Sequence, residues 1–141
     1  METNEKQTIT VSVAVNASIE TVWNYWNSPK AIVEWYIATE TWHTPKAEID
    51  LKAGGAFSYR MEAKDGSFGF DFCGVFDIIV EHSLIEITLG DNRKVKITFE
   101  SKGIDTIVTE VFEAEKVNPI EMQQLGWQTI LNSFKKYVEL K

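Results

Sequence analysis

The chain has 141 residues, of which 44% are hydrophobic and 25% charged, a composition ordinary for one globular domain. Its formal net charge of −7 disfavours nucleic acids and anionic membrane surfaces as partners. A single cysteine, Cys73, excludes an internal disulfide and suits a reducing compartment. We therefore expect one domain over residues 1–141 that needs neither a metal nor a disulfide for stability.

The sequence predicts a cytoplasmic location. Residues Met1–Lys6 lack the basic segment and the apolar run of a signal peptide. No apolar stretch approaches the ~20 residues that a membrane-spanning helix needs.

The first elements expected are a strand and two short helices. Apolar residues alternate with polar or small ones from Gln7 to Val15, and this period of two predicts a half-buried strand. Ser18 is a suitable N-cap for a first helix. Ser28 followed by Pro29 is suited to end that helix and to begin a second one.

Six further strands are predicted between Lys46 and Glu113, separated by turn signals such as Gly54-Gly55 and Asp65-Gly66. Tight turns between consecutive strands indicate an antiparallel sheet. Gly74, in the longest strand, is expected to mark a bulge or bend. The apolar residues expected to share one face of that strand are Phe68, Phe70, Phe72, Phe76, Ile78 and Val80.

A helix of about 20 residues is predicted at the C-terminus. Asn118-Pro119-Ile120-Glu121 combines an Asn cap, a first-turn proline and a Glu three residues after the cap. The apolar stripe of this helix should pack against the apolar face of the sheet, which gives an α+β fold. The stripe consists of Ile120, Trp127, Ile130, Leu131, Phe134, Tyr137 and Val138.

This order of elements resembles the START-like (SRPBCC) superfamily, and within it the AHSA-type branch named after the C-terminal domain of the activator of the heat shock protein 90 ATPase. The resemblance implies a helix-grip fold: a seven-stranded curved antiparallel sheet around a long C-terminal helix, with two short helices after the first strand. The chain departs from the family's Gly-Gly-Thr-like hairpin at residues 102–106 and lacks the separate N-terminal domain of the true co-chaperone. The resemblance is carried by Ala17–Trp23, by Ser28-Pro29-Lys30 with Trp35-Tyr36, by Asp50–Phe57 and by Gly126–Leu131.

The many aromatic side chains in so short a chain, together with the resemblance, favour a non-catalytic module. Such a module would bind a small hydrophobic ligand in an internal cavity. The opposite interpretation is that the same rings fill the interior and leave a solid core. An open pocket of roughly 300 Å³ or more would fit small-molecule binding, whereas a filled interior would favour an interaction module. The predicted cavity-lining residues are Trp35, Trp42, Phe57, Tyr59, Phe70, Phe72, Phe76, Trp127 and Leu131.

Two alternative functions remain open at this stage. The resemblance implies a protein-interaction module with a chaperone as partner, or a cyclase- or hydrolase-like enzyme. An enzyme would need inward-pointing polar groups among Tyr59, Arg60, His43 and Asp71. If a bulge shifted the strand phase, Arg60 could hold a ligand carboxylate.

No catalytic group, cofactor or metal is predicted. His43 and His82 lack further ligands at metal-binding spacing, although His43 could act as a base at the mouth of a pocket. Phosphate-binding loops and nucleophile elbows are missing from the sequence. Asp71, Asp77 and Cys73 are expected on the outer face of the sheet.

Overall fold

The computed structural model describes residues 7–141, so Met1–Lys6, on which the expectation of no signal peptide rests, lie outside the described residues. Within 7–141, no helix has the length and apolar character needed to cross a membrane, and the cytoplasmic location stays a prediction. The elements are β1 (Thr8–Val15), α1 (Ile19–Trp26), α2 (Pro29–Trp35), β2 (Trp42–Ile49), β3 (Ala56–Ala63), β4 (Gly69–Val80), β5 (Leu84–Leu89), β6 (Lys94–Lys102), β7 (Asp105–Glu113) and α3 (Ile120–Glu139).

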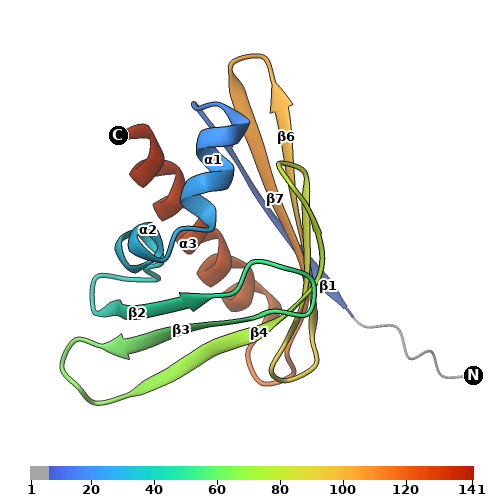
Figure 1. The fold of residues 1–141 in the computed structure, drawn as a ribbon. Helices are drawn as coiled ribbons and strands as arrows, with labels where there is room; N and C mark the ends of the chain where they lie inside the picture. Colours follow the sequence, from blue (N-terminus) through green and yellow to red (C-terminus); the bar gives the residue numbers. More distant parts are fainter. Residues whose placement is uncertain (1–6) are drawn as a thin grey trace, which may run out of the picture.

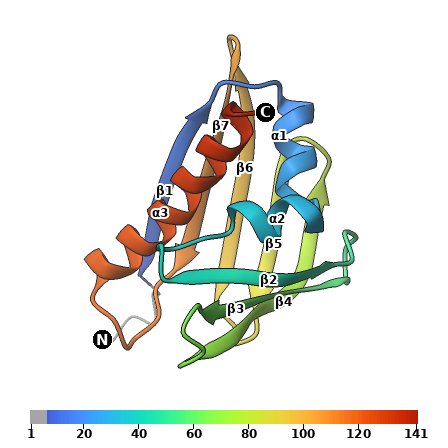
Figure 2. The same ribbon diagram turned by 90° about the vertical axis from the view of Figure 1, so that its left-hand side faces the viewer.

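The predicted helix-grip fold is confirmed. The strands form one seven-stranded sheet in the order β1-β7-β6-β5-β4-β3-β2, with antiparallel neighbours throughout. The sheet bends so that β2 and β3 run across the direction of β1, β6 and β7, and all three helices lie on its inner side (Figures 1 and 2). This curvature gives the sheet a concave face on which a cavity can form.

The short helices begin where the sequence predicts. The Ser18 side chain accepts a hydrogen bond from the Thr21 backbone N–H, and the Ser28 side chain accepts one from Ala31, with Pro29 in the first helical turn. Both caps satisfy backbone N–H groups that a helix start leaves unpaired. They turn the chain back over the sheet directly after β1.

β4 differs from its predicted pattern beyond Phe76. A register shift between Phe76 and Ile78 moves Ile79 onto the inner face opposite Ile85, and leaves Ile78 and Val80 exposed. The bulge therefore lies at Asp77 rather than at Gly74, where we expected it.

Gly74 instead permits a close approach between neighbouring strands. An added Cβ would lie 2.5 Å from the Thr88 carbonyl oxygen and 3.0 Å from the Phe57 ring. The absence of a side chain lets the Phe57 ring cover β4 at this point on the concave face.

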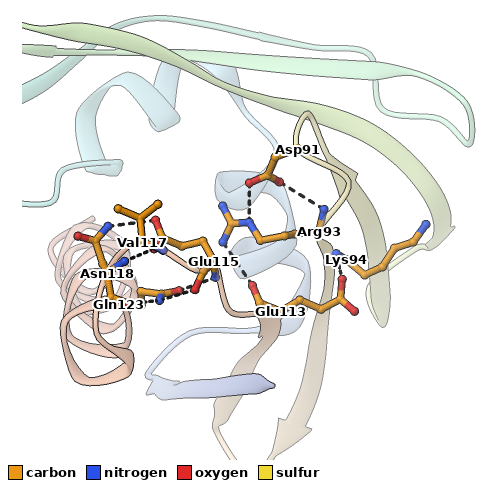
Figure 3. Close-up of polar contacts among 8 residues, drawn as sticks. All are labelled: Asp91, Arg93, Lys94, Glu113, Glu115, Val117, Asn118 and Gln123. Atoms are coloured by element: carbon orange, nitrogen blue, oxygen red, sulfur yellow. Dashed lines mark hydrogen bonds and ion pairs between the residues drawn. The ribbon is translucent and has the colours of Figure 1, made fainter. Parts of the chain in front are cut away.

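The start of α3 also differs from the prediction. The helix begins at Ile120 after Pro119, and no side chain caps it. Asn118 instead donates its side-chain amide to Glu115, and the Gln123 amide bonds both the N–H and the carbonyl of Glu115 (Figure 3). Gln123 is buried, so these bonds fix the loop that carries the chain from β7 into α3.

The other end of that loop is held by the β5–β6 turn. Arg93 bonds the Asp91 carboxylate at 2.7 Å and the Glu113 carbonyl oxygen at 3.3 Å (Figure 3). The Glu113 carboxylate accepts a bond from the Lys94 backbone N–H at 2.7 Å. This polar cluster anchors the end of β7.

Candidate functional site

A small cavity lies between the concave face of the sheet, the end of α2 and the first half of α3. Its volume of about 30 Å³ is room for one or two water molecules and falls well short of the roughly 300 Å³ of an open ligand pocket. More than half of the lining residues are aromatic. The lining comprises Trp26, Asn27, Trp35, Tyr36, Phe57, Tyr59, Phe72, Phe76, Ile85, Ile87, Val95, Ile97, Glu110 and Trp127.

The structure brings most of the sequence-predicted site residues to this cavity, although none is shown to bind a ligand. Those in the lining are Trp35, Phe57, Tyr59, Phe72, Phe76 and Trp127. Leu131 is fully buried in the core and is not part of the lining. Trp42 and Phe70 also lie outside it, in a ring cluster with the exposed Phe68.

Glu110 is a polar residue of the cavity that sequence reasoning missed, as are Tyr36 and Asn27. Glu110 lies on the inner face of β7 between Val108 and Phe112 and is only 7% exposed. Its partners on the neighbouring strands are Val11 and Ile97, both apolar and buried. The available signal was its parity, because Glu110 alternates in phase with Val108 and Phe112 rather than against them.

Burial raises the pKa of the Glu110 carboxyl from an ordinary 4.5 to about 8, because the apolar surroundings penalise the charged form. The group is therefore mostly protonated at neutral pH. In this form it can both donate and accept a hydrogen bond.

Two tyrosines accompany this carboxyl group. Tyr36, at the end of α2, and Tyr59, on β3, have ring centroids 5.1 Å apart. Burial, followed by the charge of Glu110, raises the pKa of both phenols, so both remain neutral at ordinary pH. The buried Thr44 hydroxyl donates to the Tyr36 carbonyl and fixes the end of α2 against β2.

The polar groups of the cavity are largely unpaired. Within residues 7–141, no hydrogen bond reaches the Glu110 carboxyl or the hydroxyls of Tyr36 and Tyr59. The Asn27 amide nitrogen donates to the Trp23 carbonyl at 3.0 Å, but its buried Oδ1 has no partner in the same part of the chain. Because buried polar groups are nearly always paired, this cluster indicates a place for water or for a polar group of a ligand.

Of the aromatic residues that line the cavity, Phe72 and Trp127 are the two that are only half-buried. Phe72 and Trp127 both line the cavity and meet edge to face with centroids 6.1 Å apart. Trp127 also stacks on Phe112, with centroids 3.8 Å apart and planes 10° apart. The contact between Phe72 and Trp127 is thus the most exposed part of the aromatic lining.

The other candidate groups lie away from the cavity. Arg60 pairs with Glu62 at 2.9 Å and with Asp71 at 3.6 Å, so it is not placed to hold a ligand carboxylate. His43 lies 3.8 Å from Glu62 and is not in the lining. Cys73 is exposed, as expected. Among the described residues, no cluster of His, Cys, Asp and Glu could hold a metal ion.

Comparison with known proteins agrees with this architecture. A protein from Cytophaga hutchinsonii is 52% identical, with 96% of this chain and 92% of that chain covered and a TM-score of 0.80. An AHSA1-like protein from Aeromonas hydrophila is 40% identical, with 95% and 93% covered and a TM-score of 0.89. A protein from Nitrosomonas europaea, at 16% identity and a TM-score of 0.78, shares the fold. No curated protein matches the chain significantly.

The family model described as "Activator of Hsp90 ATPase homolog 1-like protein" matches residues 16–139, which is nearly the whole described chain. The match includes both short helices, the strands from β2 to β7 and α3, and therefore every element that lines the cavity. The chain belongs to the family of activator of Hsp90 ATPase homolog 1-like proteins.

Proposed function

We propose that the chain is a single domain that binds a small, ring-bearing molecule in the cavity between the sheet and α3. The observation that supports this function is the combination of an aromatic lining with polar groups that have no hydrogen bond within residues 7–141, namely the Glu110 carboxyl, the Tyr36 and Tyr59 hydroxyls and the buried Asn27 Oδ1. Aromatic walls with a few convergent polar groups are typical of small-molecule sites.

The volume of about 30 Å³ means that only a small part of a ligand fits the cavity as it stands. Binding therefore requires the Phe72 and Trp127 rings to separate. An aromatic pair contributes about 0.5–1.5 kcal/mol beyond its buried area, so the binding energy of a ring-sized ligand can offset this loss. The ring of the ligand would then replace the contact that it displaces.

NMR titration with a panel of small apolar aromatic compounds tests this function. We expect shift changes to cluster on the Trp127 indole N–H and on Phe72 and Tyr59. Trp127→Ala should weaken binding at least severalfold because it removes one side of the site. Trp42→Ala is the matched control, since its ring lies outside the lining. Changes confined to Phe68 and Phe70 would contradict the proposal.

The enzymatic alternative has less support. Of the four residues that an enzymatic role would need inside the cavity, only Tyr59 is in the lining. A chaperone as partner is implied by the family, and a cavity of about 30 Å³ is nearer to the filled interior that would favour an interaction module than to an open pocket.

A further inference from the structure

The charge of the cavity restricts the class of ligand. Glu110 is its one carboxyl group, and the lining contains no lysine, arginine or histidine. The other titratable groups that face Glu110 are Tyr36 from α2 and Tyr59 from β3, while the facing residues of β1 and β6 are apolar and α3 contributes Trp127. An anionic ligand would find no counter-ion there and would face an acidic group.

The aromatic walls favour the opposite charge. The faces of aromatic rings attract cations, most strongly when the cation is removed from water. A buried carboxylate likewise needs a positive partner to be stable in its ionised form. Rings and carboxyl group together therefore suit a cation better than a neutral molecule.

Size restricts the cation further. The cavity of about 30 Å³ has room for one or two water molecules, and an ammonium head is about as large as a water molecule. Such a head fits without a change in the cavity itself. The attached ring would lie outward, between Phe72 and Trp127.

We propose, building on the function above, that the cavity binds the ammonium head of an arylalkyl amine, with Glu110 as its counter-ion. The ammonium N–H groups donate to the Glu110 carboxylate and to the hydroxyl oxygens of Tyr36 and Tyr59. These are groups that no hydrogen bond within residues 7–141 satisfies.

Binding of an amine should change the protonation state of Glu110. Burial holds the pKa of Glu110 at about 8, so the empty site carries a neutral carboxyl group at pH 7. The ammonium keeps its protons, and the carboxyl proton leaves to solvent as the ion pair forms. Binding should release about one proton per ligand near pH 7, and fewer as the pH rises above the pKa of Glu110.

Calorimetric titration with three probes of similar shape tests the proposal: 2-phenylethylamine, 2-phenylethanol and phenylacetate. Measurements in buffers of different ionisation enthalpy give the number of protons released. We expect the amine to bind about tenfold or more tightly than the alcohol, with proton release, and phenylacetate to bind weakest.

Glu110→Gln should abolish both the preference for the amine and the proton release, because the amide keeps the shape but cannot ionise. Glu100→Gln is the control, since it makes the same charge change at an exposed position outside the lining. If the alcohol and the amine bind equally and no proton is released, the assignment of an amine is wrong. The proposal that the cavity binds a small aromatic molecule would be unaffected. No binding of any probe would overturn both. The proton count on the unmodified protein decides the question even if Glu110→Gln folds poorly.

Discussion

Glu110 links the stability of the folded chain to pH. In the unfolded chain its carboxyl has an ordinary pKa of 4.5, whereas in the folded protein burial raises that pKa to about 8. Between these values the unfolded chain gives up a proton that the folded chain keeps. The contribution of Glu110 to stability is therefore fully present below pH 4.5 and is lost as the pH rises to about 8.

Glu110→Gln should remove this dependence. We expect the free energy of unfolding of the variant, relative to the unmodified protein, to rise by up to about 1 kcal/mol per pH unit between pH 5 and pH 8. Urea denaturation at each pH measures the difference, with Glu100→Gln as the exposed control. Parallel curves for Glu110→Gln and the unmodified protein would show that the carboxyl is not desolvated in the folded state.

At the scale of single elements, two of the three predicted helix starts agree with the structure, whereas the start of α3 does not, because Asn118 bonds Glu115 instead of capping the helix. The caps at Ser18 and Ser28–Pro29 were predicted correctly because each depends on contacts within one helical turn. The bulge at Asp77 could not be predicted in the same way. It depends on the pairing of β4 with β5, where the Thr88 hydroxyl donates to the Asp77 carboxylate at 2.6 Å.

In the candidate site, too, some residues could be placed from the alternation along a single strand, whereas others depend on how the strands pair in the sheet. Parity along each strand predicted that Phe57, Tyr59 and Phe72 would reach the cavity. Trp42 and Phe70 were predicted to line the cavity, but their pairing in the sheet places them in the cluster with Phe68, outside the lining. Glu110 is in phase with the buried Val108 and Phe112, but the usual preference of a glutamate for solvent outweighs that signal when the sequence is read alone.

Two glycines offer a matched pair of substitutions within the elements. Gly74→Ala places a Cβ 2.5 Å from a β5 carbonyl oxygen, so we expect a loss of about 1–3 kcal/mol in the free energy of unfolding. Gly126→Ala lies within α3 with no atom within 4 Å of the added Cβ, so we expect a gain of about 1 kcal/mol. Thermal and urea denaturation measure both changes. Equal effects of the two substitutions would contradict the close approach at Gly74.

At the scale of the whole molecule, α3 covers both the cavity and an edge of the sheet. β1 is an edge strand, and alternate carbonyls on its free side would otherwise be open to pairing with another chain (Figure 2). Gln124, Gln128 and Lys135 of α3 donate to the carbonyls of Thr10, Ser12 and Ala14. At the end of β1, the Asn16 N–H donates to the Glu139 carboxylate. The helix that places Trp127 at the cavity is thus held to β1 by side chains on either side of that tryptophan.

Replacing both Gln124 and Gln128 with alanine should expose this edge. We expect a loss of about 1 kcal/mol per hydrogen bond in the free energy of unfolding, together with self-association that increases with protein concentration. Size-exclusion chromatography with light scattering measures the association. Lys136→Ala is the control, because Lys136 is an exposed residue of the same helix with no bond to β1. If the double variant stays monomeric at concentrations where the unmodified protein is monomeric, the glutamines serve to hold α3 and Trp127 in place rather than to protect the edge.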